Sequence, residues 1–234
     1  EEIVNRLNVV STIFTQAPGS LCYMIGKVII PELITGINSK NDEVVSLCLS
    51  TFSDYINTFD NLLILDNNII QQKEQIAKTA ANYIDSKDIT LQANAIYFLG
   101  TFSVLLSTKQ ISSLLDIILN AFKHKPELKT KISYFEALNS IAKVSAIKQV
   151  NHIRLILPLI NTYSSKTFLE NDNSDYDEKN DLAQAVLNLT ETYVHKLSTV
   201  LGTQCNEIAK NSLELIEYDP NYTYDMNNQD IEMN

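Results

Sequence analysis

Apolar residues recur along this chain with the helical period of 3.6 residues, in runs that are separated by short polar breaks. The runs cover roughly residues 1–16, 20–38, 42–59, 69–84, 88–105, 109–123, 126–142, 147–163, 180–197 and 203–217. They arrive in pairs, and equivalent features recur about every 40 residues, a period typical of stacked helical repeats. Each pair would bury one face on its partner helix and another on the next pair. The spacing therefore favours a repeat array over a compact helical bundle.

The composition also favours helices. The chain of 234 residues has only 5 glycines and 5 prolines, too few for the many turns of an all-β fold and too scattered for a glycine-rich phosphate loop. We therefore predict an all-α fold: an α-α superhelix, that is, a HEAT/armadillo-like solenoid of about five helix pairs.

The repeat pattern also divides the chain into segments. Residues 1–164 should hold about four HEAT-like helix pairs, and residues 181–218 the final pair. Residues 165–180 are acidic and lack an apolar period, which is typical of a flexible insertion. Residues 219–234 should form a boundary motif and an acidic, disordered tail. Because the helical pattern is already under way at Glu1, without an initiator Met, we expect the chain to be part of a longer protein.

Charge is distributed unevenly along the chain. Of the net charge of −10, residues 165–179 contribute −3 and residues 217–234 contribute −5, whereas residues 123–154 carry a local +5. Such a dipolar chain lacks the uniformly basic footprint of a nucleic-acid-binding protein, so no nucleic-acid partner is expected. The basic stretch supplies the candidate partner contacts, although a solvated helix face is the alternative interpretation: Lys123, Lys125, Lys129 and Lys131.

No pattern of catalytic, cofactor-binding or metal-ligating residues is evident, so an enzyme is not expected. The histidines lie in three different helical units: His124, His152 and His195. The cysteines are widely spaced and odd in number, which favours free thiols over disulfides or zinc: Cys22, Cys48 and Cys205. The acidic segment 165–180 lacks the glycine that an EF-hand loop requires. No apolar run has membrane-spanning length, so a membrane partner is not expected either.

The end of the last helical run carries the most distinctive sequence of the chain, Tyr218-Asp219-Pro220-Asn221-Tyr222-Thr223-Tyr224-Asp225. This octapeptide resembles a motif of the cullin-associated, neddylation-dissociated family, in which a HEAT helix ends in Asp-Pro-Asn-Tyr-Asn-Tyr-Asp before an acidic stretch. The upstream segments LQANAIYFLG (91–100), YFEALNSIA (134–142) and ILPLI (156–160) are similar to repeats of that family. Thr223 departs from its asparagine, the acidic run is shorter, and 165–180 is an insertion, all of which fit a divergent fungal or protist lineage.

The resemblance implies that the whole chain corresponds to an internal part of the family's N-terminal half. It further implies a non-enzymatic scaffold in the cytoplasm, the nucleus or both. Such a scaffold wraps unneddylated cullin–RING complexes at the cullin C-terminal region and its RING subunit, and promotes exchange of substrate receptors. The remaining C-terminal half would lie on the same polypeptide or on a separate one. The alternative is another HEAT-repeat adaptor, such as a nuclear transport receptor that binds basic cargo on acidic inner surfaces.

Overall fold

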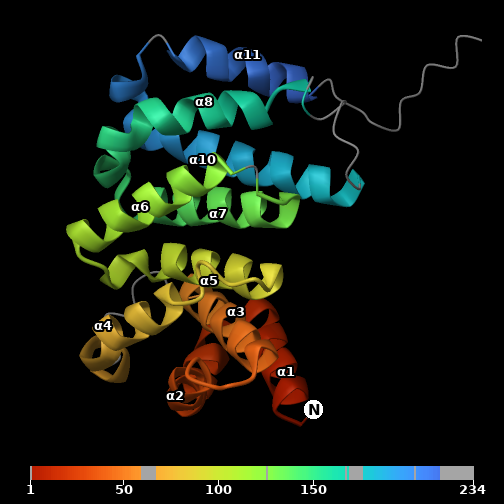
Figure 1. Ribbon diagram of the computed structural model, residues 1–234, viewed down its shortest axis with the longest axis vertical. Helices are drawn as coiled ribbons and strands as arrows, with labels where there is room; N and C mark the ends of the chain where they lie inside the picture. Colours follow the sequence, from red (N-terminus) through yellow and green to blue (C-terminus); the bar gives the residue numbers. More distant parts are fainter. Residues whose placement is uncertain are drawn as a thin grey trace, which may run out of the picture.

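The computed structural model describes residues 2–58, 67–124, 126–166, 168, 176–202 and 204–216. Every regular element in these ranges is a helix, so the predicted all-α class is confirmed (Figure 1). In chain order the helices are α1 (Glu2–Gln16), α2 (Gly19–Gly36), α3 (Asp42–Thr58), α4 (Asn67–Ala81), α5 (Ile89–Thr101), the 3-10 helix η2 (Phe102–Leu105), α6 (Thr108–Phe122), α7 (Leu128–Ser145), the 3-10 helix η3 (Ala146–His152), α8 (Ile153–Tyr163), α10 (Tyr176–Leu201) and α11 (Gln204–Ile216).

The helices form two layers, which run the length of the molecule (Figure 1). Helices α1, α3, α5, α7 and α10 pack side by side, each extensively on the next, whereas α2, α4, α6, α8 and α11 contact one another only sparsely. This arrangement confirms the predicted helical-repeat array. A two-layer stack bends toward its more closely spaced layer, so we call the first set the inner layer and the second set the outer layer.

The contacts between layers define the two-helix unit. Helix α2 contacts α3, and α4 contacts α5, more extensively than α1 contacts α2. Short connections join these helices: residues 37–41 link α2 to α3, and residues 82–88 link α4 to α5. Both outer helices therefore fold back directly onto the inner helix that follows them. Through most of the chain the unit therefore runs from outer to inner helix.

Two of the expected runs are each divided into an α-helix and a 3-10 helix. The run at 88–105 forms α5 and then the tighter turns of η2, and the run at 147–163 opens with η3 before α8. Ser145 has an extended backbone (φ −160°, ψ 82°), which separates α7 from η3. Helix α10 starts at Tyr176, ahead of the expected residue 180, and Leu197 is non-helical within it (φ −127°, ψ 17°).

Aromatic side chains connect neighbouring inner helices through the core. The Phe52 ring of α3 lies 5.3 Å from the Phe98 ring of α5, and Phe98 stacks on Phe102 of η2 at 5.1 Å, all three being fully buried. At the next junction, Gly100 of α5 packs so closely on α7 that a Cβ there would lie 2.6 Å from the Ala137 Cβ. Large rings and one missing side chain thus fix the α3–α5–α7 spacing.

Candidate protein-binding surfaces

The free side of the inner layer has a polar groove of about 460 Å³ that spans α3, α5, α7 and α10. Asn57 Nδ2 donates a hydrogen bond to the Tyr97 hydroxyl across 2.7 Å. Deeper between α10 and α7, Thr192 Oγ1 donates to Asn139 Oδ1, also across 2.7 Å. Because these bonds join successive inner helices, the polar lining is held in place by the array rather than by a loop.

Glu136 is the acidic side chain among the residues that line this groove, and Lys143 is the basic one. Burial, followed by the charge of Asp181 on α10, raises the pKa of the Glu136 carboxyl to about 7. Burial and then the Glu136 charge raise the pKa of Tyr97 to about 12. Among the described residues, no cation or hydrogen-bond donor contacts the Glu136 carboxylate. The groove therefore contains a half-buried carboxyl that can accept a proton or a cationic group.

The raised pKa of Glu136 predicts that replacing this residue changes the stability of the chain by an amount that depends on pH. Because its pKa is raised from 4.5 to about 7 on folding, the stabilisation that protonation provides is complete below pH 4.5 and is lost as the pH rises to about 7. We expect Glu136→Gln, which mimics the protonated carboxyl, to raise the free energy of unfolding by about 2–3 kcal/mol near pH 8. Near pH 4 it should have little effect. Denaturant unfolding at both pH values measures the difference.

The control for this experiment is Glu127→Gln, which removes one exposed carboxylate outside the groove. A gain of the same size in this variant near pH 8 would assign the effect to net charge and contradict the role given to burial.

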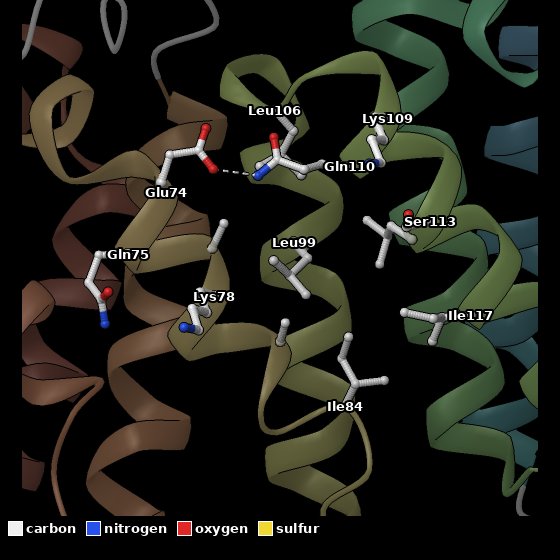
Figure 2. Close-up of a pocket in the computed structure, with 13 residues that line it drawn as sticks. Glu74, Gln75, Lys78, Ile84, Leu99, Leu106, Lys109, Gln110, Ser113 and Ile117 are labelled. Carbon is white, nitrogen blue, oxygen red and sulfur yellow. Dashed lines mark hydrogen bonds between the residues drawn. The ribbon is translucent and has the colours of Figure 1, made fainter.

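The outer layer has a second groove, of about 440 Å³, between α4 and α6 (Figure 2). Its floor is apolar and buried, formed by Ala77, Leu99 and Leu106, with Leu114 on the α6 side. Figure 2 shows Glu74 and Gln110 at one end, where Gln110 Nε2 donates to Glu74 Oε2 across 2.8 Å. The groove follows from the sparse contact between outer helices, since α4 and α6 do not close over the inner layer.

Three of the candidate lysines are described, near the junction between α6 and α7, and each contacts a different element. Lys123 Nζ donates to Asn120 Oδ1 (3.3 Å), and Lys129 Nζ donates to Thr90 Oγ1 (3.0 Å) at the start of α5. Lys131 Nζ lies 5.3 Å from the Tyr163 ring and 5.5 Å from the Phe168 ring, beyond the end of α8: a cation–π arrangement. Lys125 lies outside the described residues.

The other sequence motifs fall in different places. His152 Nε2 lies 3.1 Å from Asp116 Oδ1, and His195 Nε2 lies 3.8 Å from Glu191 Oε1. Burial raises the pKa of the Cys48 thiol to about 11, which makes it a weak nucleophile. Within the described part of the chain, no three His, Cys, Asp or Glu side chains are grouped as metal ligands would be. In the same ranges, no helix combines the length and apolarity that crossing a bilayer requires.

Two predicted segments lie largely or wholly beyond the described residues. The octapeptide 218–225 and the acidic tail after it are outside them. Of the predicted insertion 165–180, residues 167 and 169–175 are outside them, and residues 176–180 form the first turns of α10.

Comparison with known proteins supports the resemblance drawn from the octapeptide. No protein-family model matches the chain. Over 215 residues, or 92% of its length, the chain is 22% identical to cullin-associated NEDD8-dissociated protein 1 of Drosophila melanogaster. Over 218 residues, also 92% of its length, it is 18% identical to the protein of the same name from Arabidopsis thaliana. These matches cover only 16% and 17% of the two relatives. The chain is thus distantly similar, over nearly its whole length, to a small part of cullin-associated NEDD8-dissociated protein 1.

Proposed function

We propose that this chain is part of a non-enzymatic HEAT-repeat scaffold that binds cullin–RING complexes lacking NEDD8 and promotes exchange of their substrate receptors. The observation that carries the proposal is the similarity to cullin-associated NEDD8-dissociated protein 1 across 92% of the chain. The partner surface on the cullin is its C-terminal region with the RING subunit. We expect the chain to be located in the cytoplasm, the nucleus or both, where such ligases act.

The two-layer array supports this proposal physically. A helical-repeat array offers a long, continuous inner face, and such a face can exceed the roughly 1,600 Å² of a standard interface. Here that face carries the polar groove around Glu136. Binding would act by competition. The array would cover part of the partner's surface and so exclude other ligands, including an attached ubiquitin-like modifier, from that part.

A pull-down with purified cullin–RING complex, with and without covalently attached NEDD8, tests the proposal. We expect the chain to retain the unmodified complex and to lose it when the modifier is attached. Equal retention of both forms would contradict the dependence on NEDD8, and retention of neither would contradict cullin binding.

A nuclear transport receptor is the second candidate function. It is favoured by carboxylates on three inner helices, Asp54 of α3, Glu136 of α7 and Asp181 of α10, because an acidic inner face suits basic cargo. Burial raises the pKa of Asp54, while a hydrogen bond from Ser11 Oγ at 2.6 Å opposes this rise. Capture of a small GTPase or a lysine-rich peptide, without retention of either cullin form, would support this second function instead.

The lysines provide a residue-level prediction for cullin binding. We expect the triple reversal Lys123→Glu, Lys125→Glu and Lys129→Glu to weaken binding by about tenfold at low salt and less at high salt, because exposed charges are screened by ions. Lys131 is left unchanged, since reversing a cation packed over two rings would also disturb the fold. Affinity measured at two salt concentrations checks the result, and unchanged affinity would assign these lysines to solubility.

A further inference from the structure

The outer groove between α4 and α6 has an unusual distribution of charge around its apolar floor. Lys78 on the α4 wall and Lys109 on the α6 wall both line it, together with Glu74 at one end (Figure 2). Among the described residues, no carboxylate lies within ion-pair distance of either ammonium group. The rim therefore carries an unneutralised positive charge on each wall.

The Glu74 carboxylate contacts Gln110 on α6 rather than Lys78 on its own helix. Glu74 and Lys78 are four residues apart on α4, the spacing and order at which a helical ion pair normally forms. The Glu74 carboxylate instead accepts the hydrogen bond from Gln110 Nε2 at 2.8 Å. Gln110 is itself held by the α6 capping box, in which its Oε1 accepts from the Ser107 backbone N–H at 2.9 Å.

The floor and walls offer apolar surface to an occupant of suitable size. Ala77 and Ala81 on α4 leave room where longer side chains would close the groove. Ile117 lies on the opposite wall and is 41% exposed, although it is a large aliphatic residue. A trough between two helices, apolar along its floor and polar at its edges, is the surface into which a single amphipathic helix packs.

We propose that the α4–α6 groove binds an amphipathic helix of a partner protein whose apolar stripe is flanked by carboxylates. The apolar stripe would cover Leu99, Leu106 and Leu114, and the flanking carboxylates would pair with Lys78 and Lys109. The site lies on the outer layer, away from the inner groove, and this proposal does not rest on the proposed cullin binding.

Two synthetic peptides of about 16 residues test the proposal, both with leucines at helical i, i+3, i+4 and i+7 positions. One carries glutamates beside the leucine stripe, and the other carries lysines at the same positions. Fluorescence anisotropy with the full chain should give affinity at least about tenfold higher for the glutamate peptide. Equal binding of the two peptides, or binding of neither, would overturn the proposal.

Variants of the chain locate the binding site. Ala81→Trp, which places a large side chain in the groove, should abolish binding of the glutamate peptide. The double variant Lys78→Glu/Lys109→Glu should reverse the preference toward the lysine peptide, whereas the matched control Lys40→Glu/Lys148→Glu, away from the groove, should retain it. Circular dichroism should show that all three variants keep the helical content of the parent. If Ala81→Trp folds and binds as the parent does, the occupant lies elsewhere and the proposal is wrong.

Discussion

Phe98→Ala is expected to lower the free energy of unfolding by about 3–5 kcal/mol, the range found when a fully buried aromatic side chain is truncated. Phe98 lies at the centre of the cluster with Phe52 and Phe102, at 5.3 and 5.1 Å between ring centroids. Removing the ring loses its buried apolar contacts and leaves a cavity between α3 and α5. The neighbouring rings are held by their own helices and cannot move to fill this cavity. Denaturant unfolding followed by circular dichroism measures the loss.

The position of Phe98 also predicts the shape of the transition. In a repeat array each unit contacts only its neighbours, so a weakened junction can uncouple the parts on either side. We expect the unfolding curve of Phe98→Ala to broaden or to separate into two steps. Ile147→Ala, at a side chain that is 69% exposed, is the control and should change stability by less than about 0.5 kcal/mol. A loss in Phe98→Ala no greater than in this control would contradict the importance of the aromatic junction.

Gly100→Ala should lower the free energy of unfolding by about 1–3 kcal/mol, as overpacking does in a close-packed core. The direction of this change in the free energy of unfolding is informative, because glycine-to-alanine replacement inside a helix normally stabilises by roughly 0.5–1 kcal/mol. Here the added methyl group would meet Ala137, with 2.6 Å to its Cβ and 3.0 Å to its carbonyl oxygen, so α5 and α7 would have to move apart. Thermal and denaturant unfolding both report the change.

Gly36→Ala is the matched control for this experiment. Its new methyl group would meet the Cys48 side chain and no backbone atom, so a rotation of one thiol can relieve the overlap. We expect a smaller loss than for Gly100→Ala. If Gly100→Ala were as stable as the parent chain or more stable, the α5–α7 approach would be looser than the structure has it.

The sequence was sufficient to predict the fold class, because the period of 3.6 residues and the spacing of the polar breaks are set by helix packing itself. It did not predict the division of 88–105 into α5 and η2, since apolar residues continue through both and the change concerns backbone hydrogen bonding alone. Nor did it predict which helix of the series belongs to which layer, because inner and outer helices both need wide apolar stripes.

The binding surfaces could be predicted less well than the fold. Glu136 stands within the run YFEALNSIA, where one acidic residue among apolar ones was the available signal, but its environment depends on Tyr97 and Asp181 from other helices. Likewise, the four lysines are close in sequence, yet Lys129 reaches α5 and Lys131 reaches the Tyr163 ring at the end of α8. Such contacts across helices are fixed by tertiary packing, which a local pattern does not contain.

The unequal spacing of the two layers has a mechanical consequence. The inner helices are closely packed and the outer helices are not. Such a stack bends by widening or narrowing the gaps between its outer helices. A helix wedged between α4 and α6 would hold one of these gaps at a fixed width, and so would set the local curvature of the opposite face. Two partners on opposite sides of the array would then influence each other's affinity without touching, the sign depending on whether the curvature that one fixes suits the other.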